Sequence, residues 1–242
     1  MSGNALPAPP PLSSLTSPAL FLDFDGTLVS IAAEPGAISV PDGLGARIEA
    51  LAARHRGRVA VVTGRALGDL ERHLGPVELH RAGSHGAHVL DPDGKELRAA
   101  GAVPAAAKDT LREYARDNGL FYEDKTHGAG LHSRAVPEKF AAMSEFASSV
   151  AAAHGLDCKR GKQVIELVRP GADKAGAVCL LMHRPLFAGT LPVFIGDDVT
   201  DEDGFAACIE SGGFGIAVGE RASEHARYRL NGVDEVYEWL EL

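Results

Sequence analysis

Cysteine is scarce in this chain: its 242 residues contain three, Cys158, Cys179 and Cys208. They lie far apart and form no Cys-x-x-Cys pair, which argues against a disulfide framework and against a cysteine-based zinc site. A small number of unpaired cysteines is typical of proteins in a reducing compartment, so we expect a cytoplasmic location.

Long apolar runs are lacking as well, and no stretch approaches the length that a bilayer crossing requires. The first 22 residues carry no charge, but they lack the basic start of a signal peptide and are interrupted by five prolines. We therefore expect a soluble intracellular chain with a disordered tail over residues 1–18.

Basic residues are outnumbered, since 24 Lys and Arg face 33 Asp and Glu and give a formal net charge of −9. An acidic surface repels phosphate backbones and anionic lipids, so neither a nucleic acid nor a membrane is an expected partner. A local cationic pocket could still bind a small anion. A hydrophobic content of 45% is enough for one sizeable core.

Both ends of the chain show the pattern of an α/β sheet. Short apolar runs, typical of strands buried on both faces, alternate with stretches of helical periodicity. The strands are expected at 19–22, 58–62, 191–195 and 215–218, with helices from 41 to about 52 and over 202–209. The order strand, helix, strand implies parallel pairs, and thus a doubly wound α/β core formed by residues 19–103 and 171–242.

The segment 104–170 differs from both ends of the chain, because in it the order helix, strand, strand occurs twice. The helices are expected from Pro104 to about Asn118 and from Pro137 to His154, and the strands near 120–123, 130–134, 156–159 and 164–168. This pattern predicts an α+β domain inserted into the core. Such an insert is commonly a lid, and a cleft between core and lid is a natural ligand site.

Carboxylates directly follow two of the buried strands. Asp23-Phe24-Asp25-Gly26-Thr27 comes after the first, and Gly196-Asp197-Asp198-Val199-Thr200-Asp201-Glu202 comes after the strand ending at Ile195. Ligands of open α/β sheets bind at the carboxyl ends of strands, so both groups belong at one edge. A cluster of carboxylates without His or Cys suits Mg²⁺.

Two further residues supply donors that this acidic edge lacks. Thr63 ends the second core strand, and Lys174 stands in the first turn of a helix, where the helix dipole disfavours a cation. A lysine within an acidic cluster would offset the carboxylates and hold a phosphate oxygen.

Taken together, these four segments resemble the four motifs of the haloacid dehalogenase superfamily, in the usual order. The resemblance implies that Asp23 is a nucleophile and Asp25 a general acid/base, and that Thr63, Gly64 and Lys174 bind the phosphoryl oxygens. It also implies Mg²⁺ as cofactor. Its ligands would be Asp23, Asp197 and the backbone carbonyl of Asp25, supported by Asp198 and Asp201.

The insert and its flanks resemble one family within that superfamily, the trehalose-6-phosphate phosphatases. The motifs are Glu123-x-Lys125, Leu131-His132-x-Arg134, Gly161-Lys162-x-x-x-Glu166, Ser84-His85-Gly86-Ala87 and Trp239-Leu240-Glu241. The resemblance implies a cap of two helices on a four-stranded sheet, in which Lys125, His132, Arg134 and Glu166 read the sugar. Arg65, His85 and Gly86 would contact the substrate from the core side. Where family members often have an aromatic residue, this chain has Ser133.

The family's activity would be hydrolysis of trehalose 6-phosphate to trehalose and phosphate, in functional connection with the synthase that makes this substrate. One alternative is a phosphatase for another sugar phosphate, such as a sucrose or mannosylglycerate ester. Another is a non-catalytic phosphosugar sensor or regulatory partner of a synthase. Against it stands the joint presence of six residues of the four motifs: Asp23, Asp25, Thr63, Lys174, Asp197 and Asp198.

Overall fold

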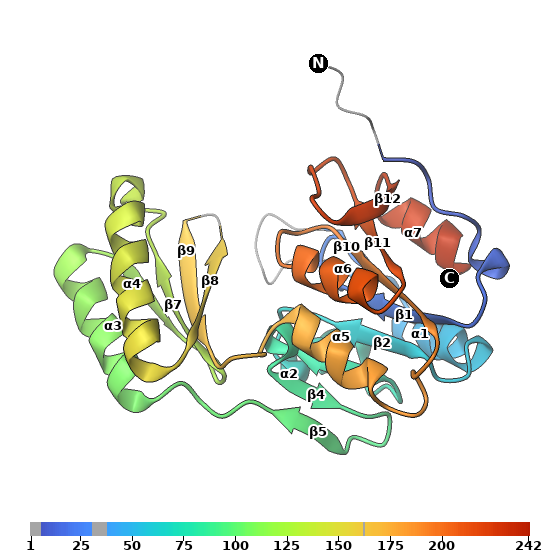
Figure 1. The fold of residues 1–242 in the computed structure, drawn as a ribbon, viewed down its shortest axis with the longest axis horizontal. Helices are drawn as coiled ribbons and strands as arrows, with labels where there is room; N and C mark the ends of the chain where they lie inside the picture. Colours follow the sequence, from blue (N-terminus) through green and yellow to red (C-terminus); the bar gives the residue numbers. More distant parts are fainter. Residues whose placement is uncertain (1–5, 31–37, 162) are drawn as a thin grey trace. The chain divides into compact units, whose positions relative to one another are not determined.

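The computed structural model describes residues 6–30, 38–161 and 163–242, and it divides the chain into two compact units (Figure 1). The core unit comprises Met1–Arg98 and Asp173–Leu242, and the cap comprises Ala99–Ala172. The cap is thus a few residues wider at each end than the insert expected at 104–170.

The core unit is organised around one eight-stranded sheet with the strand order β12-β11-β10-β1-β2-β3-β4-β5. The pairs from β12 to β3 are parallel, and β4 pairs antiparallel with β3. The strands are β1 Pro18–Leu22, β2 Val59–Val62, β3 His80–Gly83, β4 His88–Leu90, β5 Glu96–Ala99, β10 Leu191–Gly196, β11 Phe214–Val218 and β12 Ala226–Leu230.

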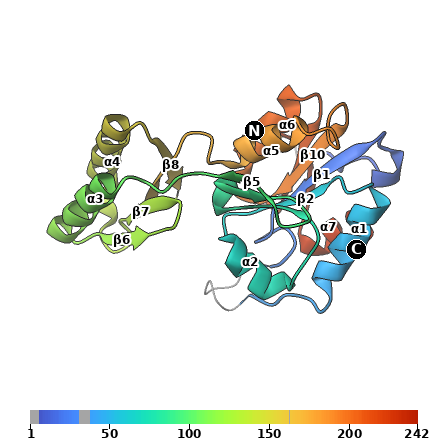
Figure 2. The same ribbon diagram turned by 90° about the horizontal axis from the view of Figure 1, so that it is seen from below.

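Helices cover both faces of this sheet, because alternate side chains of each buried strand point to opposite sides (Figure 2). Leu20 and Leu22 of β1 pack in the cluster that contains α1, α2 and α7. Ala19 and Phe21 pack in the cluster that contains α5 and α6. The helices are α1 Leu44–Arg54, α2 Leu67–Leu74, α5 Lys174–Met182, α6 Asp201–Glu210 and α7 Val233–Leu240, with short 3₁₀ turns at Leu12–Ser14 and Ser84–Gly86. A doubly wound sheet results.

The register of the central strands brings the expected site together. Leu22 of β1 is level with Ile195 of β10 on one side and with Val61 of β2 on the other. The amide of Asp23 donates to the carbonyl of Ile195 at 2.9 Å, which fixes the first residue beyond the strand. The residues that follow β1, β10 and β2 therefore meet at one edge of the sheet.

The N-terminal segment differs from the disordered tail expected over residues 1–18. Residues 1–5 lie outside the described part, but Leu12 is buried in the core. The carbonyl of Pro10 accepts a hydrogen bond from Trp239 Nε1 at 2.8 Å, and that of Pro7 accepts one from the amide of Arg229 at 2.9 Å. The prediction is wrong for this segment because prolines lack an N–H but keep their carbonyls as acceptors for a neighbouring element.

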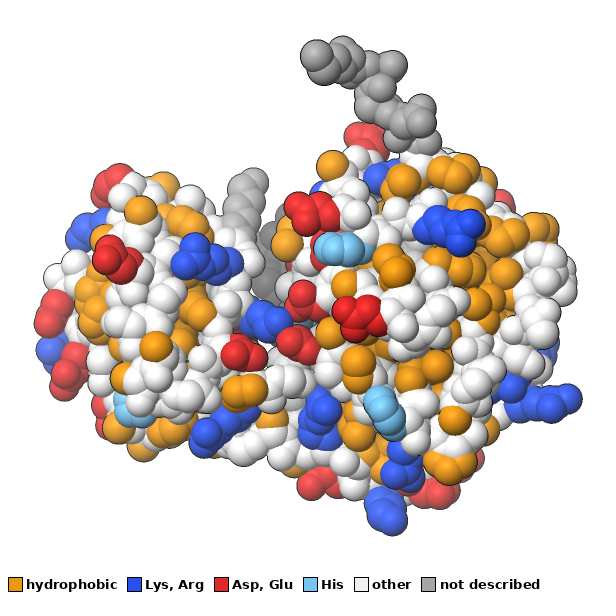
Figure 3. Space-filling view, viewed as in Figure 1, with side chains coloured by type: hydrophobic (Ala, Val, Ile, Leu, Met, Phe, Trp, Pro, Cys, Tyr) orange, Lys and Arg blue, Asp and Glu red, His pale blue; other side chains and the backbone are white. Residues whose placement is uncertain are grey.

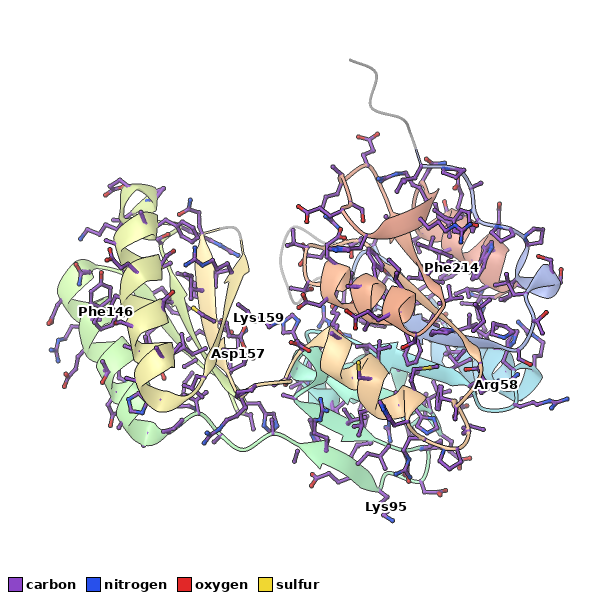
Figure 4. The ribbon with its side chains drawn as sticks, viewed as in Figure 1. Arg58, Lys95, Phe146, Asp157, Lys159 and Phe214 are labelled. Carbon is purple, nitrogen blue, oxygen red and sulfur yellow. The ribbon has the colours of Figure 1, made fainter. Side chains whose placement is uncertain are left out.

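The cap packs two helices on one face of a four-stranded antiparallel sheet of order β6-β7-β9-β8. Figure 4 labels Phe146 on α4, and its ring stacks on Tyr114 of α3 at a centroid distance of 3.8 Å. The elements are α3 Ala105–Asn118, β6 Phe121–Asp124, β7 Gly128–His132, a 3₁₀ turn Pro137–Lys139, α4 Phe140–His154, β8 Asp157–Gly161 and β9 Val164–Val168. This is the predicted α+β order.

The other face of the cap sheet carries polar side chains. Strand register places Phe121 beside His132, and Glu123, Glu166 and Lys159 along the next row. Lys159 lies on the side away from α3 and α4 (Figure 4). We call this surface the open face of the cap sheet.

Charged side chains of both signs are visible on the surface in Figure 3. On the side of the molecule drawn there, the Lys and Arg side chains of the described residues are scattered among Asp and Glu and do not form a basic stripe. Separately, among residues 6–30, 38–161 and 163–242, no helix has both the length and the apolar character needed to cross a membrane.

Candidate active site

The centre of the site is a group of three carboxylates beyond β1 and β10. One oxygen from each of Asp23, Asp197 and Asp201 lies within 4.8 Å of the others, a spacing that a metal ion could bridge. Asp23 is 4% exposed and Asp201 is fully buried. So much buried negative charge requires a compensating cation.

Lys174 supplies part of that compensation as the first residue of α5. Asp173 caps the helix by accepting from the Gly176 amide at 2.7 Å, which fixes the start of the helix. Lys174 Nζ donates to Asp23 Oδ1 at 2.7 Å and to Asp201 Oδ1 at 2.6 Å. Burial opposes the charge of this ammonium, but the carboxylates of Asp201 and Asp23 outweigh burial and raise the pKa of Lys174.

One lysine does not neutralise three acids. Burial, followed by the like charges of Asp201 and Asp198, raises the pKa of Asp197 to about 7. Burial also raises the pKa of Asp23, although Lys174 opposes the shift. Oδ1 of Asp197 is buried without a hydrogen-bond partner. Asp201 differs, because its Oδ1 accepts from Lys174 and its Oδ2 from the Asp198 amide at 2.8 Å. A divalent cation would satisfy the oxygen of Asp197 that lacks a partner.

Two glycines allow the carboxylates to approach the backbone this closely. Gly26 has a φ of +80°, and a Cβ at this position would overlap the Asp197 carboxylate. A Cβ on Gly196 would overlap the Asp201 carboxylate. The glycine that follows Asp25 therefore makes room for a side chain from the other acidic loop.

The expected phosphate-binding residues adjoin this group. Thr63 follows β2 and is fully buried, and its Oγ1 accepts a hydrogen bond from the Arg65 amide at 3.1 Å. The hydroxyl proton of Thr63 is then available to a ligand. A Cβ on Gly64 would come within 2.6 Å of the His85 ring, so only glycine allows this packing.

His85 and Gly86 lie in the 3₁₀ turn against the start of α5. The amide of His85 donates to the Thr63 carbonyl at 2.9 Å. A Cβ on Gly86 would overlap the carbonyl of Asp173, the residue before Lys174. The structure thus brings Thr63, Gly64, His85 and Gly86 together with the residue that caps α5.

Asp25 points to Arg65 rather than into the carboxylate group. Arg65 Nε and Nη2 donate to the two oxygens of Asp25, each at 2.6 Å. Nη1 of Arg65 donates to Asp69 at 2.7 Å and lies 3.2 Å from Nε2 of His73. The hydrogen bond to Asp25 raises the pKa of Arg65 and keeps it charged. Arg65 was expected to bind the substrate, but most of its N–H donors form hydrogen bonds to Asp25 and Asp69.

Asp69 and His73 lie on α2, a helix that no sequence motif marks as functional. Thr27 also contributes, because its Oγ1 lies 3.4 Å from Asp23 Oδ2. Spacing along the chain could have suggested Asp69 and His73, which follow Arg65 at helical intervals of four and eight residues.

In the cap, the structure brings three of the four expected sugar-binding residues onto or beside the open face of the sheet. Lys125 Nζ donates to Glu166 at 2.6 Å, and His132 Nε2 lies 2.9 Å from Glu123. Arg134 lies beyond β7 and is exposed. Among the described residues, no hydrogen bond or ion pair joins it to the other three. Lys162 of the Gly-Lys-x-x-x-Glu motif lies outside the described residues.

Ser133 occupies the variable position of the Leu131-His132-x-Arg134 motif. It is fully buried, and its Oγ donates to Gln163 Oε1 at 2.6 Å. The side chain therefore stabilises the ends of β7 and β9 and does not extend onto the open face.

Known proteins match this chain over nearly its whole length. The family model described as trehalose-phosphatase matches residues 21–234. A trehalose-6-phosphate phosphatase of Escherichia coli (strain K12) is 33% identical over 229 residues, which cover 93% of this chain and 85% of that protein. This chain belongs to the trehalose-phosphatase family.

Solved structures agree with the trehalose-phosphatase fold. The trehalose-6-phosphate phosphatase of Aspergillus fumigatus is 23% identical, with a TM-score of 0.76 over 98% of both chains. A haloacid dehalogenase-like hydrolase from Bacteroides thetaiotaomicron is 17% identical, with a TM-score of 0.65 over 92% of this chain and 97% of that one. These likenesses confirm the predicted fold class, a haloacid dehalogenase core with an α+β cap.

Proposed function

We propose that this chain hydrolyses trehalose 6-phosphate to trehalose and phosphate. The observation that carries the proposal is the buried Asp23 between Lys174 and the acids of the β10 loop, in a chain that matches the trehalose-phosphatase family from residue 21 to residue 234. This activity implies a functional link to the synthase that makes the substrate, and a cytoplasmic location.

We further propose that the reaction depends on Mg²⁺. The donor set fits this ion, because it consists of carboxylate oxygens and includes the buried Asp197 Oδ1 that has no partner. Asp23, Asp197 and the backbone carbonyl of Asp25 would hold it, and Asp201 and Asp198 would support it. When bound, Mg²⁺ would offset the charge repulsion between the phosphate dianion and the carboxylates.

In the first half-reaction a carboxylate oxygen of Asp23 attacks phosphorus, and the bond to the sugar oxygen breaks. An aspartyl-phosphate forms on Asp23. For this step Asp25 would carry a proton on an oxygen released from Arg65, and it would give that proton to the leaving sugar alkoxide. Lys174 and the Thr63 hydroxyl would bind phosphoryl oxygens, and Gly64 would leave room for them. Because both donors are buried and held by neighbours, they need little reorganisation.

In the second half-reaction a water molecule attacks the aspartyl-phosphate. Asp25, now ionised, takes a proton from this water, and phosphate leaves as the bond to Asp23 breaks. Asp23 and Asp25 are thereby returned to their starting states. Arg65 would hold Asp25 in place during this step by its two hydrogen bonds.

Selectivity for the disaccharide is assigned to the cap. Lys125, His132, Glu166 and Arg134 offer the donors and acceptors that sugar hydroxyls require. The ion pair between Lys125 and Glu166 orients both groups before a ligand binds. His85 and Gly86 are proposed to bind the substrate as well, whereas Arg65, expected from the sequence to bind the substrate, is proposed to orient Asp25 instead, because it donates to Asp25 and Asp69.

A phosphate-release assay on trehalose 6-phosphate, with and without EDTA, tests the proposal. We expect turnover that EDTA abolishes and Mg²⁺ restores. The panel includes glucose 6-phosphate, a sucrose phosphate and a mannosylglycerate phosphate, and equal rates across it would favour a general sugar phosphatase. Asp23→Asn should lower kcat by about 10³-fold or more, because it removes the nucleophile. An undiminished rate would reject that role, and an inactive parent protein that still binds the substrate would favour the sensor.

A further inference from the structure

Arg221 connects two loops of the core unit that are far apart in sequence. It lies three residues after β11, on the loop that leads to β12. Its Nε donates to the backbone carbonyl of Asp197 at 2.9 Å, and its Nη2 donates to that of Asp198 at 3.0 Å. The guanidinium therefore holds the main chain of the loop that carries the acidic group.

Glu202 holds Arg221 from the other side. Its Oε1 accepts from Arg221 Nη2 at 2.6 Å. Its Oε2 accepts from Ser223 Oγ at 3.0 Å and from the His225 amide at 2.9 Å. The β11 loop is also tied from β12, since Arg229 donates to the carbonyls of Gly219 and Arg221. The backbone of Arg221 is thus held by Arg229, and its guanidinium is held by Glu202. These contacts orient the side chain toward the acidic loop.

The acidic loop has reason to move if it is released. The Asp197 carboxylate is crowded by the like charges of Asp198 and Asp201, and its Oδ1 has no hydrogen-bond partner of its own. A rotation of the Asp197–Asp198 backbone would carry this carboxylate away from Asp23 and relieve the repulsion. Space for the movement exists, because Asp197, Gly26 and Arg221 line an open cavity of about 380 Å³.

We propose that Arg221 is a positioning residue that keeps the Asp197 carboxylate at the cation site beside Asp23. It acts on the metal ligand through two main-chain carbonyls, and Glu202 orients it. This inference rests on the proposed metal-dependent phosphatase function. It adds Arg221 and Glu202, which are neither proposed metal ligands nor residues of the cap. Groups that orient metal ligands typically contribute about 10-fold to 100-fold in metal affinity.

The test is direct metal binding by the full chain without substrate. Mn²⁺ prefers the same oxygen ligands and can be followed by the electron paramagnetic resonance of the free ion. Arg221→Lys keeps the positive charge, but an ammonium group lacks the planar, forked guanidinium that contacts two carbonyls and Glu202 at once. The matched control is Arg227→Lys on β12, where the parent Arg227 is exposed over the ring of Tyr228.

We expect Arg221→Lys to weaken Mn²⁺ binding by about 10-fold or more and Arg227→Lys to leave it unchanged. Glu202→Gln should weaken binding in the same direction, and the effects of Arg221→Lys and Glu202→Gln should not add in the double variant because the two residues act as one unit. A merely structural role would lower the Tm of the metal-free protein without changing its Mn²⁺ affinity. That result, or additive effects, would overturn the proposal.

The outcome is separable from the proposed activity. If the parent protein binds Mn²⁺ but does not release phosphate from trehalose 6-phosphate, the function is wrong and Arg221 is still judged by binding. If the parent binds no Mn²⁺, there is no cation site for Arg221 to maintain, and this inference fails. At saturating metal, Arg221→Lys should recover kcat to within about 3-fold, because Asp23 and Asp25 are not touched by Arg221.

Discussion

Arg65 donates to both carboxylate oxygens of Asp25, and both donor–acceptor distances are 2.6 Å. The pair joins the β1 loop to the β2 loop. Asp69 and His73 of α2 in turn hold the remaining terminal nitrogen of Arg65. The side chain proposed as the proton shuttle is therefore oriented from a helix that contributes no other residue to the site.

This arrangement predicts that Arg65→Lys lowers kcat by roughly 10-fold to 100-fold, while KM for trehalose 6-phosphate changes by less than about 3-fold. A lysine cannot form the planar two-point contact, so Asp25 loses its orientation for proton transfer. Steady-state kinetics separates the two parameters. The control is Arg72→Lys, since Arg72 is exposed and contacts Asp69 without reaching Asp25. A large rise in KM with kcat unchanged would instead assign Arg65 to substrate binding.

A second prediction concerns the close approach at Gly26. Gly26→Ala and Gly43→Ala both place a methyl group at a positive φ, and this backbone strain alone should cost about 1–2 kcal/mol in free energy of unfolding in each variant. At Gly43 the added Cβ meets nothing within 4 Å, whereas at Gly26 it overlaps the Asp197 carboxylate. Only Gly26→Ala should therefore weaken Mg²⁺ binding, by about 10-fold or more. Denaturant unfolding and metal titration of both variants check this, and equal metal affinity would contradict it.

The sequence revealed the parts of this molecule whose signals are local. Apolar runs followed by acids located β1 and β10, and the chain after Pro104 showed the two helices and four strands of the cap within a few residues. These elements carry their own periodicity and turn residues, so no tertiary information is needed to recognise them.

Elements that depend on distant partners were missed. The strand β12 reads Ala-Arg-Tyr-Arg-Leu, with polar residues inside it, and α2 has eight residues with two buried leucines. The pairs Asp25–Arg65 and Glu202–Arg221 join residues 40 and 19 positions apart. No local pattern marks such pairs, because their geometry is created by the packing of separate strands.

A third prediction links metal binding to pH. Burial and neighbouring acids raise the pKa of Asp197 to about 7 in the metal-free protein, so protons compete with Mg²⁺ below that value. Affinity should fall about 10-fold for each pH unit below 7. Since this folded-state pKa lies above the ordinary value, the protonated carboxyl stabilises the metal-free fold at low pH, and that stability is lost as pH rises through about 7.

The increase in Tm produced by a fixed Mg²⁺ concentration should therefore be larger at pH 8 than at pH 6. Thermal unfolding at both pH values measures it. Asp197→Asn serves as the control, because residue 197 can then no longer titrate, and it should show a smaller increase that depends less on pH. An increase in the parent protein that is the same at pH 6 and pH 8 would show that Asp197 does not exchange its proton for the metal.

A fourth prediction concerns the cap. Lys125→Ala breaks the 2.6 Å ion pair with Glu166, and Glu166→Ala breaks it from the other side. Each should lower kcat/KM for trehalose 6-phosphate by about 10-fold or more and change hydrolysis of a small phosphate ester by less than about 2-fold, because the ester has no sugar hydroxyls to bind. Arg116→Ala on α3 is the control, since Arg116 is exposed and pairs with its neighbour Asp117. Equal losses on both substrates would mean that the cap does not select the sugar.

The chain has a single tryptophan, and its indole nitrogen donates to the carbonyl of Pro10. Residue 239 is thereby a built-in fluorophore where the segment around Pro10 contacts the final helix. Its emission reports whether the leading segment is docked, without any added label. Purification tags fused ahead of Leu6 can be compared by this signal. A tag that displaces the segment from α7 would expose the indole to water and shift its emission to longer wavelength.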